Sequence, residues 1–141
     1  MSYQTRLELY KRLEDIRKKP ILTYVTSIRA NVPSQMSSDA IPQIIEQVNS
    51  IPPGQNDVDF LIISNGGDPI AAQRIISILR ERFKKVSVIV PYVAYSAATI
   101  LALGADEIIM HPYSNLGPVD PQMLIIKPNN LGQQSQIQLS S

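Results

Sequence analysis

The chain has 141 residues, a length that suits one domain with one hydrophobic core. Its formal net charge of +1 and its apolar share of 44% are ordinary for a globular protein and indicate neither nucleic acid nor an anionic membrane surface as an obligate partner. The sequence contains no cysteine, which excludes disulfides, thiolate chemistry and cysteine-based zinc sites.

The N-terminal segment carries apolar residues at helical spacing, which predicts a helix over 3–18 that Pro20 ends. This segment is charged throughout and does not resemble a secretory signal, and no apolar run is long enough to span a membrane. We therefore expect a cytoplasmic protein with no stable membrane span. The β-branched and aromatic residues 21–26 predict a strand, which a polar loop over 29–37 follows.

Helices and strands alternate through the middle of the chain. Ser38 is the expected N-cap of a helix over 39–50, and Pro69 suits the first position of a later helix. The further elements predicted in chain order are a strand over 58–63, a helix over 70–83, a strand over 85–90, a helix over 97–103 and a strand over 107–110. This alternation with short links predicts an α/β fold with a mainly parallel sheet and crossover helices.

The C-terminal part has a different composition. A proline-rich loop over 111–121 precedes a candidate fifth strand over 123–126. The polar tail over 129–141 is rich in glutamine, asparagine and serine, and it cannot bury enough apolar surface to offset the entropy lost on ordering. We therefore expect a single domain over 1–128 and a disordered tail.

Two loops are candidates for chemistry because each links a predicted buried strand to a helix, and the carboxyl ends of parallel strands carry ligand sites. In the first, the Gly66-Gly67 pair allows positive φ and leaves backbone N–H groups pointing outward, where they could stabilise an oxyanion. The alternative is a tight structural turn in which Asp68 caps the following helix, and the spacing alone favours it.

In the second loop, Ser96 precedes a short apolar helix. It is either a simple N-cap, which the residues alone favour, or a nucleophile at a helix N-terminus. His111 is the sequence's single histidine. It cannot form a histidine-based metal site alone, and a loop-packing role suits it better than that of a catalytic base. We expect no metal and no cofactor.

Several segments in a shared order carry a resemblance to the serine dehydrogenase proteinase family, which belongs with Clp proteases and signal peptide peptidases in the Clp/crotonase superfamily. These segments are Leu61–Asp68, Val88–Pro91, Ala94–Thr99, Gly104–Met110 and Leu116–Gln122. The resemblance implies a Clp/crotonase-like fold and a serine peptidase acting on a peptide or protein substrate. It makes Ser96 the nucleophile and assigns the oxyanion hole to Gly66 or Gly67 with the backbone of Ala97.

The sequence departs from this family at the general base. The position of the Clp-protease histidine falls at or beside Val119, so a Ser-His-Asp triad is not supported. Related membrane peptidases use a Ser-Lys pair, and Lys127, the lysine downstream of Ser96, is our candidate base. Family members also carry Gly where this chain has Ala98 and continue well beyond Gln122, so the chain is expected to be a fragment or a short form.

Two other functions stay open. The chain could be a catalytically inactive interaction subunit that keeps the fold, or an enzyme of acyl-CoA chemistry that uses the same oxyanion geometry without a serine nucleophile. The resemblance further implies a homo-oligomer. An apolar stripe on the first helix, formed by Leu9, Leu13 and Ile16, gives some independent support, although the stripe could equally pack on the chain's own sheet.

Overall fold

The computed structural model describes the backbone of residues 2–119, 123–128 and 134–139, and the side chains of residues 2–119. Helices and strands follow one another in this order: α1 (Tyr3–Arg17), β1 (Ile21–Val25), a short 3₁₀ helix η1 (Ser38–Ala40), α2 (Ile41–Ser50), β2 (Asp57–Ile63), α3 (Pro69–Arg82), β3 (Lys85–Val90), β4 (Val93–Ala94), α4 (Ala97–Leu103), β5 (Glu107–Met110), β6 (Asn115–Leu116), β7 (Met123–Pro128) and β8 (Gln134–Leu139).

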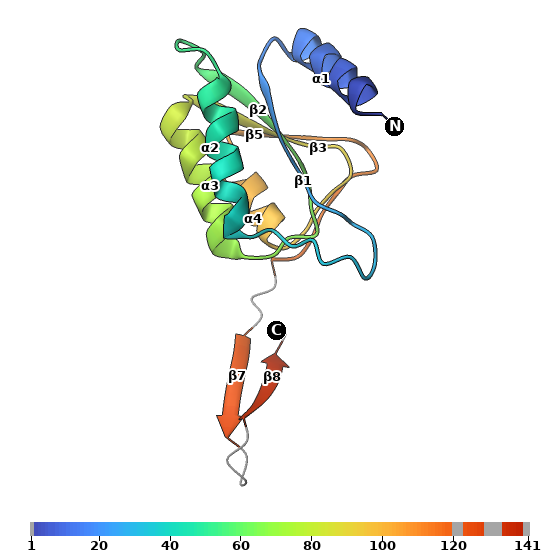
Figure 1. The fold of residues 1–141 in the computed structure, drawn as a ribbon, viewed down its shortest axis with the longest axis vertical. Coiled ribbons are helices and arrows are strands. Elements are labelled where there is room, and N and C mark those ends of the chain that lie inside the picture. Colours follow the sequence, from blue (N-terminus) through green and yellow to red (C-terminus); the bar gives the residue numbers. More distant parts are fainter. Residues whose placement is uncertain (1, 120–122, 129–133, 140–141) are drawn as a thin grey trace.

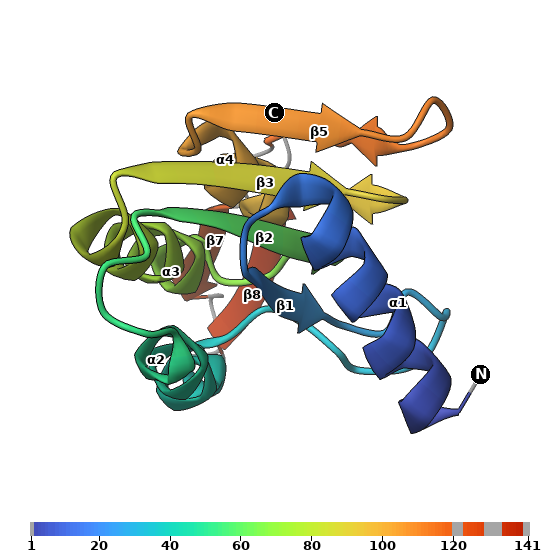
Figure 2. The same ribbon diagram turned by 90° about the horizontal axis from the view of Figure 1, so that it is seen from above.

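The main sheet has four parallel strands in the order β1-β2-β3-β5. Helices α2, α3 and α4 cover one face, and α1 lies on the opposite face (Figures 1 and 2). This arrangement confirms the predicted α/β fold with a mainly parallel sheet and crossover helices. No helix among residues 2–119 has the length and apolar character needed to cross a lipid bilayer.

The hydrophobic core lies between the sheet and the three helices. Alternate residues of β2, namely Val58, Phe60 and Ile62, are fully buried against α3, which contributes Ile75 and Leu79. The residues between them on β2 face the α1 side and are also buried. Nearly every residue of this strand is therefore buried, as its apolar sequence predicts.

The start of α2 differs from the prediction. Ser38 is not an N-cap, because it begins η1, and α2 starts at Ile41 with no side-chain cap hydrogen bond. Pro42 lies in the first turn of α2, where its fixed φ and its missing N–H are both tolerated. The predicted cap at Asp68 is confirmed, since its carboxylate accepts a 2.8 Å hydrogen bond from the N–H of Ile70.

The C-terminal residues also differ from the prediction. Residues 134–139, within the tail expected to be disordered, form β8, which pairs antiparallel with β7, so that Ile137 lies opposite Ile125. The alternation of Ile137 and Leu139 with polar residues is the period-two pattern of a strand, which the polar composition obscured. The predicted fifth strand is β7, in a separate two-stranded sheet. Residues 129–133 and 140–141 lie outside the described residues.

Candidate active site

The loop after β2 is joined to the loop after β3 by backbone hydrogen bonds. The N–H of Ser64 donates to the carbonyl of Val93 at 3.1 Å, and the N–H of Tyr95 donates to the carbonyl of Ser64 at 3.0 Å. The two predicted loops therefore meet at the carboxyl edge of the sheet. This contact places Gly66 and Ser96 next to each other.

Gly66 is buried and adopts a φ of +92°, a conformation that side chains rarely accept. A Cβ added there would lie 2.5 Å from the carbonyl oxygen of Tyr95 and 2.8 Å from the Cβ of Ser96. The missing side chain therefore allows the β2 loop to pack directly on the turn that carries Ser96.

Gly67 packs on a different segment. It adopts a φ of +149° and forms a parallel bridge with Met36. The Met36 N–H donates to the carbonyl of Gly66, and the Met36 carbonyl accepts from the N–H of Asp68, both at 2.8 Å. A Cβ at Gly67 would overlap the backbone of Met36. The glycine pair is thus held between Met36 on one side and Ser96 on the other.

Ser96 has an unusual backbone for a non-glycine residue, with φ 51° and ψ −120°. Such a conformation costs about 1–3 kcal/mol and persists only where the surroundings enforce it. Ser96 occupies the N-cap position of α4, as its placement in the sequence predicts, but its side chain makes no cap hydrogen bond. The sharp turn between β4 and α4 presents a half-buried hydroxyl at the start of the helix.

The three N–H groups predicted to form the oxyanion hole differ in whether they already have a hydrogen-bond acceptor. The Gly66 N–H is already occupied, because it donates to the buried hydroxyl of Ser64 at 3.1 Å. The N–H groups of Gly67 and Ala97 have no recorded acceptor within residues 2–119, and Ala97 is the first residue of α4, where no intrahelical acceptor exists. Of the three predicted oxyanion donors, Gly66 therefore has an acceptor within residues 2–119, and none is recorded for Gly67 and Ala97.

Thr99 was not singled out in the sequence, although it contributes to the site. Its buried hydroxyl lies 2.7 Å from the carbonyl oxygen of Ala94 and 3.1 Å from that of Gly117, and it also accepts from the Gly117 N–H at 3.2 Å. It thereby ties the segment after β6 to the turn that carries Ser96. A threonine inside an otherwise apolar helix, three residues after the serine, is the sequence signal that could have revealed it.

Within residues 2–119, no histidine or lysine side chain has a recorded hydrogen bond to the Ser96 hydroxyl. His111 is exposed; its Nδ1 accepts from the N–H of Tyr113 at 3.3 Å, and the two rings lie 5.4 Å apart. Val119, the position expected for the Clp-protease histidine, is 48% exposed. Lys127 lies on β7, opposite Ser135, and its side chain lies outside the described part of the chain.

Comparison with known proteins shows the family of this chain. The sequence profile of a family described as ClpP-like SDH-type serine proteinase matches residues 4–131. Two uncharacterized proteins of Methanocaldococcus jannaschii are similar over 71 residues, at 41% and 42% identity. The similar segment covers 50% of this chain but only 24% and 25% of the lengths of these relatives.

Proposed function

Because the chain belongs to the ClpP-like SDH-type serine proteinases, we propose that it is a peptidase with Ser96 as its nucleophile. The observation that carries this proposal is the strained backbone of Ser96, together with a hydroxyl that does not cap the helix it precedes. A serine needed only as a cap would adopt extended backbone and accept a hydrogen bond from the first turn. Strain that serves no packing role is typical of a nucleophile presented on a sharp turn.

In this mechanism the Ser96 Oγ attacks the carbonyl carbon of the scissile peptide bond as its proton moves to a base. The negative charge that develops on the carbonyl oxygen is stabilised by the N–H groups of Gly67 and Ala97. Collapse of the tetrahedral intermediate breaks the C–N bond, and the leaving amine takes the proton. Water then hydrolyses the acyl-enzyme by the same route.

The base in this proposal is Lys127. Its assignment rests on the resemblance to membrane peptidases that use a Ser-Lys pair. A lysine base must be neutral, and burial near the nucleophile would lower its pKa for that purpose.

Labelling with a fluorophosphonate probe tests both residues. Ser96→Ala should abolish labelling, whereas Ser77→Ala, at an exposed serine on α3, should leave it unchanged. Lys127→Met should reduce the labelling rate at least 100-fold, with Lys84→Met as the exposed control. Equal labelling of Ser96→Ala and the wild type would reject the nucleophile. A folded wild type that is not labelled would overturn the peptidase proposal.

The proposal includes assembly into a homo-oligomer. Ile16 is 75% exposed and Leu9 is 42% exposed, which supports an interface on α1. Leu13, the third residue of the predicted stripe, is half-buried. Light scattering should give a mass of at least two chains, and Ile16→Glu should lower it. A monomer throughout the micromolar range would overturn this part.

A further inference from the structure

The outer edge of β1 is one of the two edges of the main sheet. In a parallel ladder, alternate residues of a strand bond to the neighbouring strand. The Asp59 N–H donates to the carbonyl of Pro20, and the Thr26 N–H donates to that of Ile63, so the even-numbered residues of this segment face β2. The N–H and C=O groups of Ile21, Thr23 and Val25 therefore point outward.

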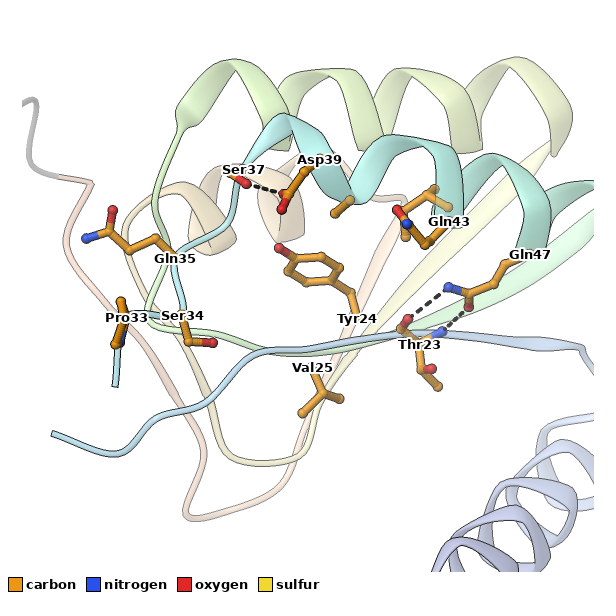
Figure 3. A pocket seen from close by; sticks show the side chains of 12 residues that line it. Thr23, Tyr24, Val25, Pro33, Ser34, Gln35, Ser37, Asp39, Gln43 and Gln47 are labelled. Atoms are coloured by element: carbon orange, nitrogen blue, oxygen red, sulfur yellow. Dashed lines mark hydrogen bonds between the residues drawn. The ribbon is translucent and has the colours of Figure 1, made fainter. Parts of the chain in front are cut away.

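Side chains from two helices occupy part of this edge. Glu14 accepts from the N–H of Ile21 at 2.9 Å. The side-chain amide of Gln47 accepts from the Thr23 N–H at 2.9 Å and donates to the Thr23 carbonyl at 3.3 Å (Figure 3). Gln47 thus bonds to the edge as the peptide group of a neighbouring strand would. Within residues 2–119, the outward groups of Val25 have no recorded partner.

An open groove of about 850 Å³ runs beside this edge, between β1, the loop over 33–37 and α2 (Figure 3). Its lining is rich in amide and hydroxyl groups, which suit the backbone of a peptide. Asp39 is the charged residue of the lining, and no ion pair is recorded for it in the described part of the chain.

The side chain of Tyr24 points from β1 toward Ser37 and Asp39 (Figure 3). Burial raises the pKa of the Tyr24 hydroxyl, and the charge of Asp39 raises it further, while the backbone N–H of Ser37 lowers it. The negative charge of Asp39 is therefore felt inside the groove, where it would attract a positively charged group.

We propose that this groove binds an extended peptide segment carrying a basic residue, which joins the outer edge of β1 as an additional strand. Its backbone replaces Gln47 on Thr23 and bonds to the open groups of Val25, and its basic side chain pairs with Asp39. The side-chain amide of Gln47 already makes the two hydrogen bonds with Thr23 that a peptide group of the added strand would make.

The groove lies next to the candidate active site but is separate from it. The loop over 33–37 forms a wall of the groove, and Met36 within this loop bonds to Gly66 and Asp68. A peptide in the groove therefore contacts a segment that holds the glycine turn. Its binding does not depend on Ser96 and can be measured in the Ser96→Ala protein.

The test uses a fluorescein-labelled heptapeptide of alternating threonine and valine with a central lysine, measured by fluorescence anisotropy. Two N-methylated versions are compared, each blocking the N–H groups along one edge of the extended peptide. We expect one version to lose at least tenfold in affinity and the other to bind as the parent does, because one edge of an added strand meets β1 and the other meets water. Equal effects of the two methylation patterns, or no binding of the parent, would overturn the proposal.

Two variants locate the site. Gln47→Ala should tighten binding about fivefold because it removes the internal competitor, whereas Gln73→Ala, at an exposed glutamine on α3, should not change it. Asp39→Asn should weaken binding about threefold for the lysine peptide and leave a norleucine analogue unaffected, with Asp15→Asn as the control. Unchanged or weaker binding by Gln47→Ala, or equal effects of Asp39→Asn on the two peptides, would place the peptide elsewhere.

Discussion

The main sheet has one polar region at its carboxyl edge and another nearer the amino ends of its strands, and the two differ in how many of their polar groups have hydrogen-bond or ion-pair partners. At the carboxyl edge, the N–H groups of Gly67 and Ala97 have no recorded acceptor within residues 2–119, and Ser96 keeps a strained backbone. Nearer the amino ends of the strands, Asp59, Ser87 and Glu107 lie side by side in the register of β2, β3 and β5. Each of these three side chains has a partner.

The second region is an ordered ion-pair network. Arg17, at the end of α1, places its Nε 2.6 Å from Oδ2 of fully buried Asp59 and its Nη2 3.4 Å from Oε2 of Glu107. The hydroxyl of Ser87, also fully buried, donates to Glu107 at 2.9 Å and accepts from Lys19 at 3.3 Å. Arg17 and Lys19 thereby fasten α1 to the sheet. Satisfied buried polar groups suit a structural role, whereas the donors at the carboxyl edge suit the chemistry proposed above.

The largest expected effect comes from breaking the carboxyl-edge region with Gly67→Val. The new side chain overlaps the Met36 backbone, so the bridge between the two segments must open. We expect a loss of about 3 kcal/mol in stability and no fluorophosphonate labelling. The control is Gly54→Ala: its φ of +93° makes it cost about 1 kcal/mol, but it meets no atom within 4 Å and should keep full labelling. Full labelling of Gly67→Val would show that this turn is only structural.

The next largest effect is expected from Arg17→Met, which removes a charge from the satisfied region. The Asp59 carboxylate stays fully buried, and Lys19 remains 3.8 Å from it. Loss of one partner of a buried pair costs about 3–5 kcal/mol, and we expect about 3 kcal/mol because Lys19 compensates in part. Urea denaturation measures this loss, while the labelling rate of the folded fraction should stay within twofold. A stability change below 0.5 kcal/mol would mean that α1 does not depend on this network.

A smaller effect, of opposite sign, is expected from Ser96→Gly. Glycine adopts positive φ without strain, so this variant should be more stable by about 1 kcal/mol while losing all labelling. Ser77→Gly, in the interior of α3, should instead be less stable by about 0.5–1 kcal/mol. Thermal unfolding distinguishes the two. A destabilised Ser96→Gly would indicate that the serine backbone is not strained.

The smallest effect concerns acid pH. The hydrogen bond from Ser87 lowers the pKa of Glu107 below its ordinary value of 4.5, with smaller contributions from Lys85, Arg17 and Lys19. A depressed carboxyl pKa adds stability that is present above the unfolded pKa and is lost as pH falls through the folded value. Glu107→Gln should therefore lose less stability than the wild type on acidification below pH 4.5. Identical stability curves against pH would exclude this contribution.

The sequence predicted most elements because their patterns are local. The apolar run of β2, the Asp68 cap followed by Pro69, and the stripe of α3 each specify their own backbone conformation. The errors lie where local signals compete. The sequence predicts a cap at Ser38 because serine suits that position, although α2 begins at Ile41 with Pro42 in its first turn. The polar composition of the tail conceals the alternation of β8.

By itself, the sequence determined that this chain forms a parallel α/β sheet and that its glycine pair and Ser96 follow the ends of buried strands. Only the tertiary structure decided which of these backbone donors have an acceptor within residues 2–119: Gly66 donates to Ser64, whereas no acceptor is recorded there for Gly67. It also decided that Ser96 has a positive φ and makes no side-chain cap, and that its turn packs on Gly66, 30 positions earlier in the numbering. Local propensity acts within a few residues, but strain and hydrogen-bond competition depend on segments that meet only after folding.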